Sequence, residues 1–201
     1  MRDCRILRDA TLNAAHVTME ARPVRHSRCV MTEMVIPNDL NGLGNLLGGR
    51  LLHWMDLCAA ISAQRHTNRV CVTAAVDFVE FRSPIRQGEI VVLESQVNRA
   101  FRTSMEVEVN VWAENPLTQT RRFCNRAFYT FVAVDETGRP VPIPPVQPET
   151  PEEQERYEQA ARRRELRLLL SGRLPSEKAR QLQASLTELA ASASSSDEPN
   201  P

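Results

Sequence analysis

The stretch NGLGNLLGGRLLHWMD, residues 41–56, joins a glycine-containing loop to an apolar segment that ends on a carboxylate. Gly48-Gly49 separates the two parts, and the apolar run continues past Asp56 to about residue 66. Its apolar members include Leu51, Leu52, Trp54, Met55, Leu57, Cys58, Ala59 and Ile61. A helix that is apolar around most of its circumference is buried. We therefore expect a central buried helix over about residues 49–66.

Asp56 is the unusual residue of this helix. An ionised carboxylate among apolar side chains is unfavourable unless it is hydrogen-bonded or has a chemical task. The task available is that of a general base on water or of a direct nucleophile. The first amides of a helix have no intrahelical partner and lie at the positive end of its dipole, so Gly48 and Gly49 can hold a carbonyl oxygen. A structural role, in which Asp56 caps a strand amide or pairs with a buried arginine, stays open; the double glycine and Asn41 favour the catalytic role.

Extended segments surround this helix. One precedes the loop and four follow it, at residues 27–37, 70–81, 89–100, 103–114 and 120–135. No helical pattern separates the last four, which favours antiparallel neighbours. Strict alternation from Met105 to Trp112 predicts one wet and one dry face. We therefore expect an α+β fold in which a curved antiparallel sheet wraps the helix, with an exposed edge that pairs with a second copy.

The two ends of the chain differ in composition from this domain, which we place at residues 27–142. Residues 1–26 contain acids, which transit peptides avoid, and are expected to form a flexible arm. The segment PVPIPPVQPETP, residues 140–151, is dense in proline, so we interpret residues 143–190 as a proline linker followed by C-terminal helices. The tail at 191–201 is poor in apolar residues and expected to be disordered.

Bulk composition excludes several classes of function. The 25 basic and 25 acidic residues give a formal net charge of zero, which provides no general attraction to nucleic acid. No run of eighteen apolar residues exists, so no membrane span is expected. The five cysteines are odd in number and scattered, which is typical of a reduced, cytoplasmic protein. Neither they nor the four histidines have metal-ligand spacing, so we expect no metal.

A family resemblance follows from the spacing of the loop and helix residues. The pattern consists of Asn41, Gly44, Asn45, Gly48, Gly49 and Asp56. It resembles the signature of hotdog-fold acyl-CoA thioesterases, which include bacterial single-domain forms and animal cytosolic enzymes. The similarity continues through residues 72–97, 102–115 and 127–142, and covers roughly residues 27–165.

The resemblance implies hydrolysis of fatty acyl-CoA to a free fatty acid and CoA, at a site between two subunits. Asp56 of one copy is then the catalytic carboxylate, Asn41 of the facing copy positions the water or the thioester, and the amides near Gly48 and Gly49 hold the thioester oxygen. No separate cofactor is implied, because the coenzyme A thioester is the substrate. The family often forms trimers of dimers, so a dimer is the expected minimum and a hexamer the expected assembly.

The resemblance also implies contacts to the coenzyme A part of the substrate. The pantetheine arm runs beside the strand that carries Thr73 and Ala74. The residues expected near the phosphates are Arg102, Thr103 and Ser104, with Arg82, Arg99 and Arg126 as further candidates. Guanidinium groups suit phosphate geometry, and the arginines are candidates as a group near one edge; for any single one a solvated surface position is the better interpretation.

Two other activities remain as alternatives. Hydration or dehydration of acyl thioesters pairs the aspartate with a histidine about five residues on, whereas position 61 is Ile61 and the nearest downstream histidine is His66. The second alternative is a non-catalytic acyl-CoA sensor or assembly subunit, in which Asp56 is structural and the C-terminal helices contact a partner.

Overall fold

The computed structural model describes residues 19–77 and 79–173, and the isolated positions 177, 180, 181, 184 and 187. The elements in chain order are β1 (Arg22–Pro23), the 3-10 helix η1 (Val24–Ser27), β2 (Cys29–Met34), the 3-10 helix η2 (Pro37–Asp39), α1 (Gly48–Thr67), β3 (Val70–Asp77), β4 (Ile90–Ala100), β5 (Ser104–Asn115), β6 (Thr120–Val134), β7 (Val146–Gln147) and α2 (Pro151–Leu170).

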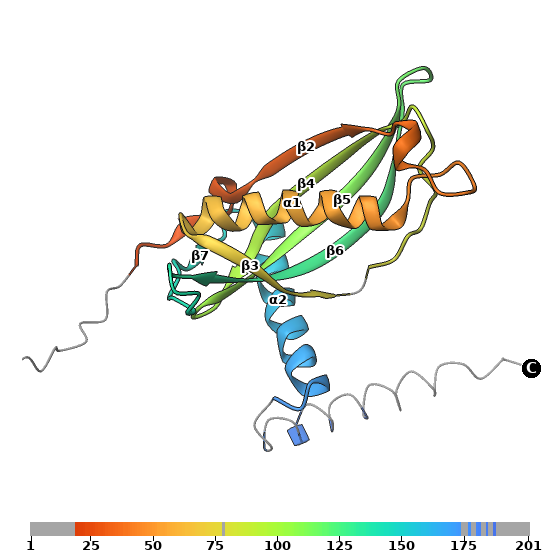
Figure 1. The fold of residues 1–201 in the computed structure, drawn as a ribbon. Coiled ribbons are helices and arrows are strands. Elements are labelled where there is room, and N and C mark those ends of the chain that lie inside the picture. The colour runs from red at the N-terminus through yellow and green to blue at the C-terminus, as the bar shows by residue number, and fades with distance from the viewer. Residues whose placement is uncertain are drawn as a thin grey trace, which may run out of the picture.

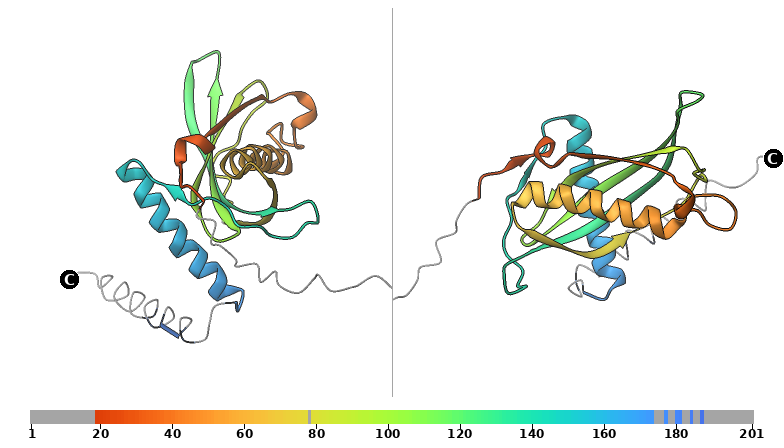
Figure 2. Two further views of the ribbon diagram at one scale, coloured as in Figure 1. Left: turned by 90° about the vertical axis from the view of Figure 1, so that its left-hand side faces the viewer. Right: turned by 45° about the horizontal axis from the view of Figure 1, so that its top comes forward.

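Five strands form one antiparallel sheet in the order β2-β4-β5-β6-β3. The sheet curves around α1, which lies in its concave face (Figure 1). Seen along the helix, α1 is enclosed by the sheet on one side and open on the other (Figure 2, left). The expected α+β arrangement of a curved sheet around one helix is therefore confirmed.

The core forms between α1 and the concave face of the sheet. Met55, Cys58 and Ala59 have no exposed surface, and they pack in one cluster with side chains of β5 and β6 such as Val107 and Phe131. Complete burial of a side chain the size of methionine contributes about 1.5–3 kcal/mol to stability. Ala63 and His66 in the second half of α1 are also fully buried, so the helix is fixed in place along most of its length.

One stripe of α1 remains uncovered, which differs from the expectation of an apolar helix buried all round. Leu57 and Ile61 are 43% and 39% exposed. Next to them runs the edge strand β3, on which Val72 and Val76 are 46% and 43% exposed. The apolar residues of α1 thus form two surfaces. The described residues cover the surface that faces the sheet and leave the one with Leu57 and Ile61 exposed.

The strand predicted at residues 70–81 is shorter than expected. β3 ends at Asp77, and residues 79–81 have no regular structure. A bulge between Thr73 and Ala75 leaves Ala74 without a register partner on β6. The chain then continues beside β6 in the same direction, and the amide of Arg82 donates to the carbonyl of Cys124 at 3.3 Å.

The described part of the expected flexible arm is ordered, so that prediction is wrong for residues 22–26. β1 pairs in parallel with β7, and the amide of Arg22 donates to the carbonyl of Pro145 at 2.8 Å. Val24 is 1% exposed. The proline-rich segment is likewise packed against the domain, because Ile143 and Val146 are buried. Both segments are ordered because their apolar side chains are buried, although their composition had suggested a flexible arm and a linker.

Helix α2 begins at a well-capped end. Thr150 accepts a hydrogen bond from the amide of Glu153 at 3.2 Å, and Pro151 occupies the first helical position. The helix lies on the convex face of the sheet, opposite α1 (Figure 2, left). The expected second C-terminal helix, apart from the five isolated positions, and the tail at 191–201 lie outside the described residues, as does the arm at 1–18.

The face of β5 that was expected to be wet is covered by α2. Glu106 and Glu108 are only 1% and 3% exposed. Arg163 of α2 donates to both carboxylate oxygens of Glu106, at 2.7 and 3.1 Å, and Arg156 pairs with Glu108 at 3.5 Å. Alternation of charged and apolar residues indicates two faces, but here the charged face is buried because arginines of α2 neutralise its carboxylates.

Candidate active site

The start of α1 has unpaired amides. Leu47 is the N-cap and provides no side-chain cap. The amides of Arg50 and Leu51 donate to its carbonyl, whereas those of Gly48 and Gly49 have no hydrogen-bond partner among the described residues. They lie at the positive end of a twenty-residue helix. This arrangement can bind a carbonyl oxygen and stabilise negative charge that develops on it.

Asn41 shapes the loop that leads to this helix. Its side-chain oxygen accepts hydrogen bonds from the amides of Leu43 at 2.9 Å and Asn45 at 3.2 Å. Gly44 closes the turn with a φ of 73°, a conformation that favours glycine. The side-chain nitrogen of Asn41 has no partner within the described part of the chain. Asn41 is half-buried and lines a cavity of about 350 Å³.

Asp56 lies two turns into α1 and is half-buried. Its Oδ1 accepts a hydrogen bond from the hydroxyl of Thr73 at 2.7 Å, and no ion pair involves it in the described part of the chain. Burial, and then the negative charge of Asp56, raise the pKa of the Tyr129 phenol. Among the described residues, neither the buried arginine nor the strand amide of the structural alternative contacts Asp56.

The sequence did not indicate the contact of Thr73 with Asp56. Thr73 was expected to lie along the pantetheine arm, and both it and Ala74 are exposed on the edge strand β3. The hydroxyl nevertheless points to the helix and fixes one oxygen of the carboxylate. Seventeen positions separate the two residues, so only the packing of β3 beside α1 brings them together.

The three single arginines expected at the phosphates do not gather at one edge within the chain. Arg82 is exposed and lines the same cavity as Asn41. Arg99 stacks on the ring of Tyr157 in α2 at 4.0 Å and donates to its carbonyl. Arg126 contacts Glu108 at 3.1 Å on the face that α2 covers. Two of the three thus lie on the side of the sheet opposite to α1.

Arg102 and Thr103 lie in the turn between β4 and β5, and Ser104 is the first residue of β5. The backbone of the turn is engaged: the carbonyl of Arg102 accepts from the amide of Ile143, and that of Thr103 accepts from the amide of Ala133. Arg102 is exposed and Thr103 and Ser104 are half-buried. A contact of these residues with phosphate stays a prediction.

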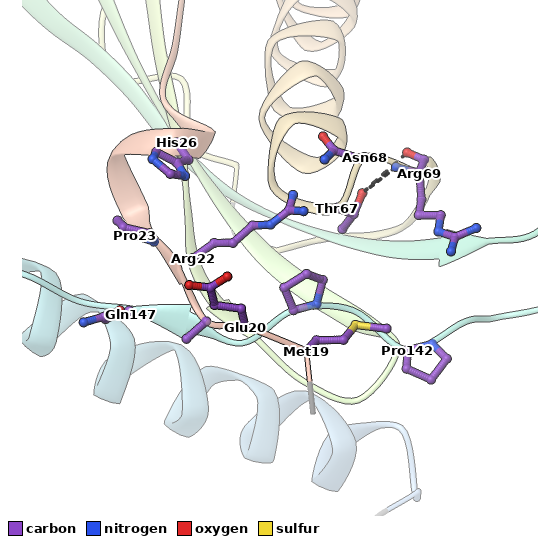
Figure 3. Close-up of a pocket in the computed structure, with 12 residues that line it drawn as sticks. Met19, Glu20, Arg22, Pro23, His26, Thr67, Asn68, Arg69, Pro142 and Gln147 are labelled. Atoms are coloured by element: carbon purple, nitrogen blue, oxygen red, sulfur yellow. Dashed lines mark hydrogen bonds between the residues drawn. The ribbon is translucent and has the colours of Figure 1, made fainter. Parts of the chain in front are cut away.

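A second cavity, of about 760 Å³, lies at the opposite end of α1 (Figure 3). Arg22, His26 and Asn68 are among its lining residues, and Asp56, Asn41, Gly48 and Gly49 are not. Arg22 donates to the carbonyl of His66 at 2.6 Å. A cation at a helix C-terminus stabilises the helix. We therefore assign the arginine a structural role.

The chain is similar to known proteins over most of the domain. A sequence model described as the thioesterase superfamily matches residues 43–119. The Bacillus subtilis protein named uncharacterized acyl-CoA thioester hydrolase YkhA is 46% identical over 136 residues, which are 68% of this chain and 79% of that protein. The mammalian relatives are longer: this chain spans 25% of the mouse acyl-coenzyme A thioesterase 11, to which it is 37% identical over 147 residues.

Solved structures of acyl-CoA thioesterases and hydrolases are also similar to this chain. A crystal structure of an apo-hexameric acyl-CoA thioesterase superimposes with a TM-score of 0.72 at 44% identity, covering 74% of this chain and 96% of that one. The acyl-CoA hydrolase from Staphylococcus aureus, solved in complex with butyryl coenzyme A, coenzyme A and coenzyme A disulfide, gives 0.69 at 31% identity, covering 86% and 99%. The same hydrolase was also solved as three alanine variants, of an aspartate, an asparagine and a threonine. On this fold, this similarity and the geometry at Gly48, the chain belongs to the hotdog-fold acyl-CoA thioesterases and is a thioester hydrolase.

Proposed function

We propose that the chain hydrolyses fatty acyl-CoA and that Asp56 is the general base or nucleophile of the reaction. The observation that carries the proposal is the carboxylate of Asp56, free of cations and held by Thr73 two turns from the unpaired amides of Gly48 and Gly49. The spacing of the asparagine, aspartate and threonine replaced in the Staphylococcus aureus hydrolase equals that of Asn41, Asp56 and Thr73 and supports this choice.

The proposed reaction begins with the thioester oxygen at the amides of Gly48 and Gly49. Asp56 takes a proton from a water molecule, whose oxygen adds to the carbonyl carbon, or attacks that carbon itself. Negative charge moves to the thioester oxygen, where the helix start stabilises it. The carbon–sulfur bond then breaks, and coenzyme A leaves as a thiolate that takes up a proton. If Asp56 acted as the nucleophile, the acyl group is left on it as an anhydride, which water hydrolyses to release the fatty acid and restore the carboxylate.

The site is completed by a second copy of the chain in this proposal. Asn41 of the facing copy, with its free side-chain amide, positions the water or the thioester. The exposed apolar side chains of β3 and α1 support such pairing, because an apolar sheet edge and helix stripe are unfavourable in water. The relative named as a hexamer supports a hexamer here, with a dimer as the minimum.

The remaining features of the substrate complex are proposed as follows. The pantetheine arm lies along β3 near Ala74, and the phosphates meet basic residues of which Arg82 and Arg102 are exposed in the single chain. No cofactor is needed beyond the substrate. Relatives named as cytosolic support a cytoplasmic location, as do four free, buried cysteines among the described residues. No described helix has the length and hydropathy to cross a bilayer.

Release of coenzyme A thiol from acetyl- and palmitoyl-CoA, with wild type and Asp56→Ala, tests the proposal. We expect wild type to turn over palmitoyl-CoA, and the variant to lose roughly 10²–10⁴-fold in kcat, the span of a lost general base. Calorimetric binding of coenzyme A should be retained. An Asp56→Ala enzyme with wild-type kcat rejects the assigned role, and a wild type that binds palmitoyl-CoA without releasing thiol indicates a sensor instead.

A further inference from the structure

Phe81 lies directly against the start of α1. A Cβ built on Gly48 would meet the ring at 3.3 Å from Cζ and at 3.7 Å from both Cε atoms. Cα–Cβ bonds of a helix tilt toward its N-terminus. The ring therefore covers the side of Gly48 that faces the same end as the unpaired amides.

Phe81 also lines the cavity that Asn41 lines, together with three buried apolar side chains. Leu46, Leu51 and Ile85 line the same cavity and are 8%, 3% and 3% exposed. The amide of Leu46 donates to the carbonyl of Ile85 at 2.7 Å, which joins the loop before α1 to the segment after β3. Phe81 is 54% exposed and can contact a ligand.

The position of Phe81 beside Gly48 determines which part of a bound thioester its ring can contact. A carbonyl oxygen that accepts from the Gly48 or Gly49 amide lies about 2.9 Å from the nitrogen. The carbonyl carbon and the next carbon of the acyl group follow within two bonds, which is within van der Waals reach of a ring packed on Gly48. The distant part of a long acyl chain has no such constraint.

We propose that Phe81 is a specificity-determining residue that limits the bulk of the acyl group at the carbon next to the carbonyl. The inference rests on the proposed function, because it needs the thioester oxygen at the start of α1. With the ring in place, linear acyl groups fit beside it, and acyl groups branched at this carbon are turned over with a lower kcat/KM. A Cβ at position 48 would require the ring to shift by a few tenths of an ångström.

The direct test compares kcat/KM for butyryl-, isobutyryl- and palmitoyl-CoA in wild type, Phe81→Ala and Phe81→Leu. We expect the isobutyryl-to-butyryl ratio to rise at least about tenfold in Phe81→Ala, since one methyl group in an apolar pocket discriminates by roughly 10–200-fold. Phe81→Leu should move the ratio in the same direction by less. The palmitoyl-to-butyryl ratio should change by less than the branched ratio. Leu117→Ala, which removes a 92% exposed side chain on the β5–β6 turn, is the matched control and should alter neither ratio.

Two glycine substitutions give an independent test that does not remove the ring. Gly48→Ala adds a Cβ that shifts the ring by a few tenths of an ångström, so it should change the isobutyryl-to-butyryl ratio in the otherwise wild-type chain and leave it unchanged in the Phe81→Ala background. Gly49→Ala adds a Cβ that meets nothing within 4 Å and should leave the ratio unaltered, whatever its effect on rate.

Three outcomes overturn the proposal. The first is a branched ratio within twofold of wild type in both Phe81 variants. The second is an equal shift of the palmitoyl ratio, which means that the ring senses chain length. The third is an equal effect of Gly48→Ala with and without the ring. Each can occur while Asp56→Ala still abolishes turnover, so failure here is distinguishable from failure of the catalytic assignment.

Discussion

Replacement of Thr73 by valine removes one hydrogen bond to Asp56 and keeps the shape of the side chain. The hydroxyl donates to Oδ1 at 2.7 Å, and a hydrogen bond to a charged group contributes about 1.5–3 kcal/mol. Thr73 is exposed in the single chain, and water can replace part of the contact, so the lower value applies. A loss of about 1.5 kcal/mol in the transition state lowers kcat roughly tenfold.

The assay for this prediction is thiol release from butyryl-CoA over a range of substrate concentrations. We expect kcat to fall and KM to stay within twofold, because the hydroxyl orients the carboxylate and does not hold coenzyme A. Thr73→Ser keeps the donor and should restore most of the rate. A Thr73→Val enzyme with unchanged kcat and a raised KM refutes this reasoning and returns Thr73 to the pantetheine contact expected from the sequence.

Two predictions concern stability. His66 is fully buried with Nε2 2.9 Å from the carbonyl of Pro144, and burial lowers its pKa below the ordinary 6.5. The unfolded chain therefore takes up a proton near pH 6.5 that the folded chain excludes, so stability falls as pH drops below this value. Tm measured from pH 7.5 to 5.5 should fall more steeply for wild type than for His66→Gln, and equal slopes contradict this account. Arg163→Met leaves the carboxylate of Glu106, 1% exposed, with Asn98 as its one remaining hydrogen-bond donor among the described residues, and should cost about 3–5 kcal/mol in urea unfolding. Adding Glu106→Gln should restore much of this stability, and an unchanged midpoint in the single variant opposes the prediction.

The periodic parts of the fold could be predicted from the sequence. The helix at 49–66 and the four later strands have long, unambiguous patterns, and Asp56 stood out because a carboxylate interrupts an apolar run. The predicted helix lies within two residues of α1 at both ends. These features depend on local spacing, which the sequence contains.

Features that depend on packing between distant segments could not be predicted. The burial of Glu106 requires Arg163, 57 positions later in α2. The place of Arg126 on the convex face depends on which side of β6 the helix α1 occupies. Phe81 was assigned to the extended segment at residues 70–81, whereas the chain leaves the sheet after Asp77 and brings the ring to Gly48.

In the proposed site, Asp56 comes from one copy of the chain and Asn41 from the other, and this sharing can be tested by mixing two inactive variants. Asp56→Ala and Asn41→Ala chains, each inactive alone, are mixed under conditions in which labelled subunits are shown to exchange. A mixed dimer then contains one intact site, formed by the Asn41 of one chain and the Asp56 of the other. Random exchange at equal concentrations predicts recovery of roughly a quarter of wild-type kcat, since half the dimers carry one of two sites. Activity that stays at the level of the separate variants, with exchange confirmed, contradicts a site shared between subunits.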